Sequence, residues 1–275
     1  MKVLLTNDDG IEAAGLANLK LALNSLIPEE HCWIVAPHQQ ISGCSHQVTT
    51  GRPFRALARG ERTFAVEGSP ADCVRVALFK LAPAVDWVLS GINEGGNLGS
   101  DVYLSGTVAA VREAAMRGIP GIAISQYRAG GQPIDWEQAQ RWTREILAEL
   151  MEQPLPRGAF WNVNLPHLPA GSPLPERVYC PLCTQPLPLD YAVEAEGNGA
   201  ESLWFRYQGR YAERARDPQT DTDICFSGRV AITQVQLAKD SVPLGCVDLS
   251  FEPKESTDEI EKTQEVPGQF VKTRK

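Results

Sequence analysis

The sequence has little of what marks a membrane, secreted or nucleic-acid-binding protein. No stretch of its 275 residues approaches the ~20 consecutive apolar residues that a membrane-spanning helix needs. Asp plus Glu (34) outnumber Lys plus Arg (26), and a net charge of −8 lacks the cationic excess of nucleic-acid-binding proteins. The apolar run within residues 1–10 is too short for a secretory signal. We therefore expect a cytoplasmic protein with neither membrane nor nucleic-acid partners.

Cysteine and histidine are too scattered to indicate disulfides or zinc. The seven cysteines are an odd number without a regular framework, which suits a reducing compartment. Cys180 and Cys183 form the one close pair, and a structural zinc site of the usual kind needs a second such pair. We therefore expect no zinc site.

The two common nucleotide-binding loops are missing as well. The Gly- and Asn-rich segment 90–99 contains no GxGxxG that runs directly into a helix and no Gly-Lys-Ser/Thr. Its glycines nevertheless let the backbone approach a ligand closely, and its asparagines offer neutral oxygen and nitrogen contacts. A glycine-rich connection with local Asn hydrogen bonds is the alternative interpretation.

What is present is an alternation of short apolar runs with helical patterns. Strands are predicted at residues 2–6, 32–36, 64–66, 85–89 and 121–125. Helices are predicted at residues 11–26, 71–81 and 105–117. Such alternation predicts an α/β fold with a mostly parallel sheet and right-handed crossovers. Because ligands of such sheets bind beyond the carboxyl ends of the strands, the polar segments 7–10, 38–50 and 90–99 should converge on one edge.

The second half of the chain is less regular. A helix is predicted at residues 136–151, and strands are predicted at 161–165, 202–207 and 230–237. Residues 166–200 are rich in Pro and Gly and are expected to be irregular. We expect a single domain over residues 1–250, with a core at about 1–130 and an extension region at about 131–250. A polar tail is expected at 251–275.

Two adjacent carboxylates, Asp8 and Asp9, follow the first predicted strand. They repel each other and would raise one pKa unless a cation lies beside them. A hard cation such as Mg²⁺ or Mn²⁺ would relieve that cost. The alternative is a solvated turn, since Asn-Asp-Asp-Gly is good turn chemistry and Asp can cap a following helix.

Hydroxyl groups at a helix start form the next candidate site. Ser105, Gly106 and Thr107 precede an alanine-rich helical pattern, and free N–H groups at such a start favour an anion. An ordinary N-cap is the alternative. Ser42 is, on its own, one loop serine among several, and the nearby His38 and His46 are candidate proton shuttles.

Taken together, these motifs resemble the SurE (stationary-phase survival protein) family of nucleoside monophosphate phosphatases. The matching segments cover roughly residues 1–237 in the right order. They are NDDG (7–10), VAP (35–37), SG (42–43), GSPADC (68–73), SGINEGGNLG (90–99), SGTVAA (105–110), NVNLP (162–166) and TDI (222–224).

The resemblance implies a Rossmann-like three-layer fold with a C-terminal β-hairpin extension, to which residues 202–209 are similar. It implies hydrolysis of nucleoside 5′- and 3′-monophosphates, often with some polyphosphatase activity, and assembly as a homodimer or homotetramer. One divalent metal ion per subunit, Mg²⁺ or Mn²⁺, is implied to be held by Asp8, Asp9, Ser42 and Asn93. Phosphate contacts are implied for Asn97, Ser105, Gly106 and Thr107.

The chain departs from the family pattern at a few positions. His38 and Ile41 stand where members usually have Asp and Arg. These two differences bear on the substrate preference more than on the binding of the metal. Members also often have Ala-Pro-Gly early in the first helix, where this chain has Ala-Ala-Gly at 13–15.

The predicted reaction is attack of a metal-activated water on phosphorus, with Asp8 or Asp9 orienting or deprotonating that water. A rival is transfer through an aspartyl-phosphate, which usually places its two aspartates one residue apart rather than adjacent. A rival outside enzymes is a nucleotide- or phosphate-sensing module that has lost turnover, and the changes at His38 and Ile41 keep it open.

Overall fold

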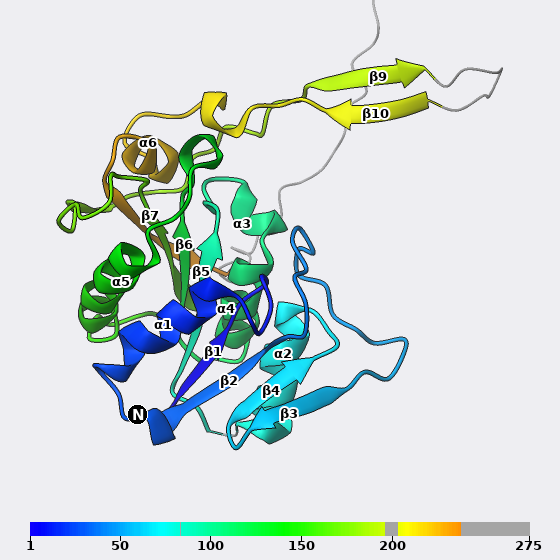
Figure 1. Cartoon of the computed structure of the whole chain (residues 1–275), viewed down its shortest axis with the longest axis vertical. Coiled ribbons are helices and arrows are strands. Elements are labelled where there is room, and N and C mark those ends of the chain that lie inside the picture. Colours follow the sequence, from blue (N-terminus) through cyan, green and yellow to red (C-terminus); the bar gives the residue numbers. More distant parts are fainter. Residues whose placement is uncertain (83, 196–202, 238–275) are drawn as a thin grey trace, which may run out of the picture. The chain divides into compact units, whose positions relative to one another are not determined.

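A mixed nine-stranded sheet forms the centre of the molecule in the computed structural model, which describes residues 1–82, 84–195 and 203–237 (Figure 1). Its strand order is β3-β4-β2-β1-β5-β6-β7-β11-β8. The strands are β1 (Val3–Thr6), β2 (Cys32–Pro37), β3 (Ala56–Gly60), β4 (Thr63–Val66), β5 (Trp87–Glu94), β6 (Gly121–Gln126), β7 (Ala159–Leu165), β8 (Arg177–Tyr179) and β11 (Val230–Gln236).

Strand direction and order define where a ligand can bind. The strands from β4 through β7 are all parallel to their neighbours, while β3 and β11 add antiparallel pairs. From β1 the chain first builds outward to β2 and β4, and then returns to the other side of β1 with β5 and β6. In open α/β sheets, the crevice beyond the carboxyl ends at such a reversal is the usual ligand site. Here it lies between β1 and β5.

Helices cover both faces of the sheet and make it the middle of three layers (Figure 1). On one face lie α1 (Ala14–Asn24) and α5 (Trp136–Leu150), and on the other lie α2 (Pro70–Val76) and α4 (Gly106–Met116). The remaining helical turns are η1 (Glu29–His31), η2 (Ala77–Leu81), α3 (Asp101–Leu104), η3 (Ala129–Gly131), η4 (Tyr211–Glu213) and α6 (Asp221–Phe226).

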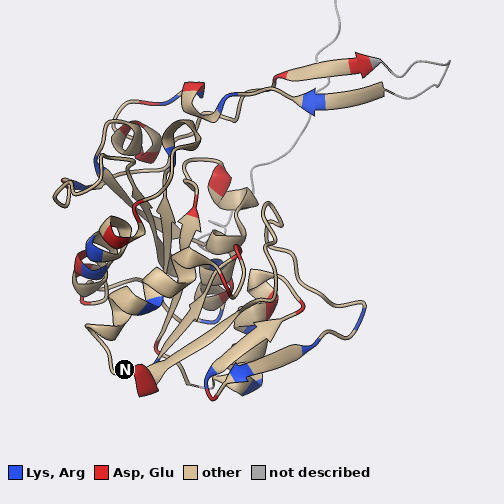
Figure 2. Ribbon diagram, viewed as in Figure 1, with Lys and Arg blue, Asp and Glu red and all other residues tan. Residues whose placement is uncertain are grey.

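Because both faces are covered, β1 is buried along its length and divides its apolar side chains between two cores. Val3 and Leu5 pack with α1 and α5, whereas Leu4 packs with α2 and α4. The outward side of α5 carries Lys or Arg and Asp or Glu together (Figure 2), so the helix turns a charged face to solvent and an apolar face to the sheet.

The predicted α/β class, the parallel sheet and most element positions are confirmed. The helix predicted at 71–81 is confirmed too, since it is α-helical to Val76 and continues as the π-helical turn η2 to Leu81. Two other local features differ from the prediction. The strand predicted at 85–89 runs on to Glu94, so half of the Gly- and Asn-rich segment is strand. Edge strand β3 was missed because all five of its residues are exposed and show no alternation.

The stretch 166–200, predicted to be irregular, contains two strands. One is β8, and the other is β9 (Tyr191–Ala195), which pairs antiparallel with β10 (Leu203–Tyr207). The β9–β10 pair is the expected hairpin extension (Figure 1). Its first strand was missed because Pro-rich sequence leads directly into it.

Residues Met1–Ala238 form one compact unit. The predicted end of the domain at residue 250 and the predicted tail at 251–275 lie outside the described residues. Across the segments that the structure describes, every helix is too short or too polar to cross a membrane.

Candidate active site

Loops from distant parts of the chain meet at the reversal point between β1 and β5. They enclose a cavity of about 280 Å³. Its walls are Asp8, Asp9, Ser42, Gly43, Asn93, Glu94, Gly95, Gly96, Asn97, Asp101, Leu104 and Ser105. Folding therefore gathers all four residues predicted to hold a metal, together with two of those predicted to contact phosphate.

The turn after β1 presents the two carboxylates. Asn7 closes this turn: its Nδ2 donates to the carbonyl of Gly10 over 2.8 Å, and its Oδ1 accepts from the Gly10 N–H over 3.2 Å. Asp8 is buried rather than solvated, with 5% of its surface exposed. The N-cap of α1 is Ala13, which has no capping side chain, so neither aspartate caps that helix. The solvated-turn and capping alternatives both fail for Asp8.

Burial and mutual repulsion make the two carboxylates costly to ionise. Burial, together with the charge of Asp9, raises the pKa of Asp8 to about 6 despite the opposing hydrogen bond from Thr107. Burial also raises the pKa of Asp9, which the N–H of Glu94 opposes. Within the described residues, no Lys, Arg or His forms an ion pair with either aspartate. The pair, with Asp8 buried and Asp9 partly buried, is thus a negative site that no cationic side chain of the described residues compensates.

Gln40 links Asp9 to Ser42, and sequence reasoning did not identify it. Its Nε2 donates to Asp9 Oδ1 over 3.3 Å and to Ser42 Oγ over 3.0 Å. One hydrogen-bond donor therefore reaches two of the oxygens assigned to the metal. The other oxygen of Asp9 accepts the N–H of Glu94 over 3.1 Å, which ties the turn after β1 to the end of β5.

Asn93 lies at the end of β5 with its amide oriented by the backbone. Its Nδ2 donates to the carbonyl of Gly95 over 2.9 Å. In the described part of the chain its Oδ1 accepts no hydrogen bond, so an oxygen is left to meet a cation. The side chain lines the cavity with the two aspartates and Ser42.

Asn97 is held by a buried network of amides. Its N–H donates to Asn164 Oδ1 over 2.8 Å, and its Nδ2 donates to Ser125 Oγ over 2.7 Å. Its carbonyl accepts from Asn162 and Asn164 over 2.8 and 3.1 Å. The NVNLP motif on β7 thus acts on the site by fixing the backbone of Asn97.

The start of α4 packs directly on Asp8. Ser105 lines the cavity, and its hydroxyl also accepts from the backbone of the third residue of the helix, so it is an N-cap as well. Thr107 is fully buried and its hydroxyl donates to Asp8 Oδ1. A Cβ on Gly106 would lie 2.8 Å from Asp8 Cβ and 2.9 Å from Cys44 Sγ. Gly106 and Thr107 therefore position Asp8 and do not line the cavity.

Asp101, which sequence reasoning missed, clamps the loop between Asn97 and α4. Its Oδ2 accepts from the N–H of Leu98 over 3.0 Å, from Tyr211 Oη over 2.5 Å and from Arg214 Nη1 over 2.8 Å. The Arg214 side chain is fully buried and stacks over the Tyr211 ring at 5.1 Å. The segment that follows the β9–β10 hairpin thus reaches the wall of the cavity.

In the segment that holds the TDI motif (222–224), the aspartate that contacts the loop near the site lies two residues before the aspartate of the motif. In Thr-Asp-Thr-Asp at 220–223 the buried carboxylate is Asp221, not Asp223. Asp221 accepts from the N–H groups of Gly99 and Cys183 over 2.7 and 2.8 Å. Asp223 instead lies near Arg216 at 3.7 Å. The repeated dipeptide made the register ambiguous from sequence.

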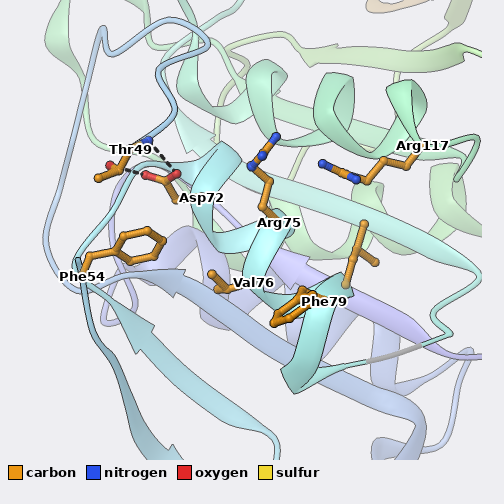
Figure 3. Close-up of a pocket in the computed structure, with 8 residues that line it drawn as sticks. Thr49, Phe54, Asp72, Arg75, Val76, Phe79 and Arg117 are labelled. Carbon is orange, nitrogen blue, oxygen red and sulfur yellow. Dashed lines mark hydrogen bonds between the residues drawn. The ribbon is translucent and has the colours of Figure 1, made fainter. Parts of the chain in front are cut away.

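The loop that carries Ser42 is anchored at its far end on α2. Figure 3 shows Thr49 donating to Asp72, through its N–H over 2.9 Å and its hydroxyl over 2.7 Å. Ser69 donates to the carbonyl of Gln47 over 2.5 Å. Thr49 and Asp72 also line a separate cavity of about 420 Å³. The GSPADC motif therefore supports the Ser42 loop from outside the site.

Neither loop histidine lies among the residues that line the site. His46 Nε2 lies 2.9 Å from Glu113 Oε2, which fastens the loop to α4. His38 Nδ1 lies 3.3 Å from the carbonyl of Val66. At Ile41 the backbone N–H donates to the carbonyl of Asp8 over 2.8 Å, so this departure from the family pattern still supports the turn.

The donor set of the candidate site is oxygen-rich. In residues 1–82, 84–195 and 203–237, no group of three or more His, Cys, Asp and Glu side chains is placed to hold one metal ion. The site offers two carboxylates together with a hydroxyl and an amide oxygen, which are ligands of hard cations. Cys180 and Cys183 are free thiols away from this cavity.

Residues 3–184 match the family model described as "Survival protein SurE". The chain belongs to the SurE family. A protein of Nostoc sp. is 49% identical to this SurE chain over 237 residues, which is 86% of this chain and 100% of the relative.

Two further likenesses support SurE membership. "5'-nucleotidase SurE" of Mesorhizobium japonicum is 37% identical over 245 residues, which covers 86% of this chain and 94% of that protein. The crystal structure of the SurE protein from Aquifex aeolicus superposes with a TM-score of 0.76 at 28% identity, covering 88% of this chain and 95% of that one. The SurE family model contains every residue predicted for the site, whereas Tyr211, Arg214 and Asp221 lie beyond its end.

Proposed function

We propose that the chain is a metal-dependent phosphatase that hydrolyses nucleoside 5′- and 3′-monophosphates to nucleoside and phosphate. The observation that carries the proposal is the pair Asp8 and Asp9 at the reversal point of the sheet, where a buried and a partly buried carboxylate face a cavity beside the start of a helix. The name 5′-nucleotidase, borne by SurE relatives over nearly their whole length, agrees with this chemistry.

A divalent cation suits the residues of this site. Asp8, Asp9, Ser42 and Asn93 would hold it, because they line one cavity and no protein cation in the described residues pairs with the two carboxylates. When bound, Mg²⁺ or Mn²⁺ supplies charge neutralisation at the phosphoryl group and acidifies water for attack.

The chain's own groups then bind and orient the substrate. Ser105 and Asn97 lie at the wall where the phosphoryl group would enter, and the dipole of α4 favours the anion there. Thr107 holds Asp8 through its hydroxyl, which keeps one carboxylate oxygen directed away from the helix. One carboxylate of the pair accepts the proton of the attacking water.

The direct test is phosphate release from adenosine and guanosine monophosphates by the purified chain, with Mn²⁺, with Mg²⁺ and with a chelator. Inorganic polyphosphate serves as a second class of substrate. We expect release that depends on the metal. Binding of nucleotide without any release would contradict the phosphatase and favour a sensing module.

Metal affinity is expected to rise with pH up to about 6. The pKa of Asp8 is raised to about 6, so below that value a proton competes with the cation. Affinity should gain up to about tenfold per pH unit between pH 5 and 6 and then level off, since one proton is displaced. Calorimetric titration with Mn²⁺ at several pH values measures it. An Asp8→Asn variant should lose this slope, and an unchanged slope in that variant would contradict the assignment.

We further propose that β9 and β10 contact a second copy of the chain in a homodimer or homotetramer. The β9–β10 hairpin exposes large apolar side chains, among them Trp204 and Phe205 at 58% and 61% exposure, and such exposure is costly in an isolated chain. Light scattering after size exclusion should find an oligomer that Trp204→Ser with Phe205→Ser weakens. An unaltered oligomer in this double variant would exclude the β9–β10 hairpin as the contact between the copies.

A further inference from the structure

A second, smaller cavity adjoins the candidate active site on the side of α1 and α5. Its volume is about 140 Å³, and it shares Asp9 and Glu94 with the larger cavity. Its other walls are Ala13, Ala14, Gly15, Gln40 and Trp136. The two cavities therefore lie on either side of residues that face the reaction centre.

The floor of this cavity is kept open by small residues. At 13–15, on the first turn of α1, no side chain exceeds a methyl group. At Gly15 even a methyl group is excluded, because a Cβ there would lie 1.8 Å from the carbonyl oxygen of Ile92. The same Cβ would lie 3.2 Å from Cη2 of Trp136, so the indole ring lies close to this turn.

Among the described residues that line the two cavities, Trp136 alone is aromatic. It begins α5, which packs beside α1 (Figure 1), and its ring is half-buried against the core. An aromatic ring that is both fixed by packing and open to a cavity is suited to stack on another planar ring. Base–aromatic stacking is a general means of binding nucleotides without reading their identity.

We propose that the smaller cavity receives the nucleobase of the substrate, which stacks on Trp136 while the phosphate lies in the larger cavity. This inference rests on the proposed function and adds to it the reason for nucleotides as substrates. The polar groups beside the ring are Gln40, which contacts Asp9, and Glu94, which pairs with Arg128. The Gln40 Nε2 and one carboxylate oxygen of Glu94 are thus engaged within the protein, so stacking on the ring dominates the binding of the base and several bases are accepted.

The test narrows the cavity without touching the reaction centre. Ala14 is exposed at the start of α1, and Ala14→Leu keeps a strong helix former while it fills the cavity. Ala17→Leu is the matched control, because Ala17 is exposed on the same helix and lines neither cavity. Kinetics are compared on adenosine 5′-monophosphate and on ribose 5-phosphate, which has no base.

In Ala14→Leu, we expect KM for adenosine monophosphate to rise roughly ten- to hundredfold, as for loss of a base stack, with little change in kcat. The kcat/KM for ribose 5-phosphate should stay within about twofold of the unmodified chain. Ala17→Leu should match the unmodified chain on both substrates. An equal loss on both substrates, or no loss on adenosine monophosphate, overturns the inference.

The ring itself is tested by two substitutions of Trp136. Trp136→Phe keeps an aromatic face and should retain most of the affinity for adenosine monophosphate, whereas Trp136→Leu keeps apolar bulk without that face and should lose it. Equal KM values in the two variants, with both chains folded, would contradict stacking.

Equilibrium binding separates this inference from the proposed reaction. Adenosine monophosphate is titrated calorimetrically into the unmodified chain and the variants Ala14→Leu and Ala17→Leu. If no ester is hydrolysed, the proposed function fails, while selective loss of binding in Ala14→Leu still supports the base site. If hydrolysis occurs and Ala14→Leu binds as tightly as Ala17→Leu, the base site alone is wrong.

Discussion

Asp9→Asn is expected to abolish nearly all phosphate release while leaving the fold intact. The substitution removes a charged oxygen ligand from the site proposed for the cation. A metal ion contributes several kcal/mol to such a reaction and each 1.4 kcal/mol is about tenfold in rate, so the loss should be on the order of 10³-fold or more. Phosphate release at saturating Mn²⁺ and adenosine monophosphate measures it.

The same variant should not be less stable than the unmodified chain when metal is absent. The pKa of Asp9 is raised by burial, so its ionised form costs stability at neutral pH, and a neutral amide removes that cost. Melting with a chelator should therefore occur at the same or a higher temperature, whereas Mn²⁺ should no longer raise it. Glu12→Gln, an exposed neighbour outside the cavity, is the matched control. Undiminished turnover in folded Asp9→Asn would rule out the assignment.

Arg214→Met is expected to cost the fold about 3–5 kcal/mol, the usual result of leaving a buried charge without its partner. Arg214 is completely buried and its ion pair with Asp101 is 2.8 Å long, with 11% of the Asp101 side chain exposed. Without the guanidinium, the charged Asp101 carboxylate keeps only the hydrogen bonds from the Leu98 N–H and the Tyr211 hydroxyl. Urea denaturation measures the loss through the shift of the midpoint.

A double variant separates lost charge pairing from lost packing. Asp101→Asn with Arg214→Met removes both charges, so it should be more stable than Arg214→Met alone. Arg210→Met is a matched control, since Arg210 lies in the same segment and is exposed in its pair with Glu213; it should change stability by less than about 1 kcal/mol. If Arg214→Met destabilised the chain no more than Arg210→Met, the ion pair between Asp101 and Arg214 would not contribute to stability.

Several elements of the site were readable from sequence because the signal is local. Asp8 and Asp9 follow an apolar run and precede a glycine, which already places them in a turn after a strand. The glycines and asparagines of 90–99 likewise stand out from their surroundings. The convergence of these segments was predicted from parallel topology, and the cavity contains them together.

Other residues carry no such signal, because their role is set by contacts far along the chain. Asp101 reaches Arg214 across 113 positions, and Asp221 reaches Gly99 across 122. Gln40 is an ordinary loop glutamine until folding brings its amide to Asp9 and Ser42. Nothing in a local window distinguishes these side chains from solvated ones.

The sequence by itself determined the α/β class, the first parallel strands and the identity of the oxygen-bearing side chains, since hydrophobic period and turn chemistry act over neighbouring residues. Only the tertiary structure decided that Asp8 is buried, that Gly106 and Thr107 support it from outside the cavity, and that Trp136 faces a second cavity. Burial, pKa and cavity shape depend on which segments, distant in the sequence, pack together. A local sequence pattern does not show which segments these are.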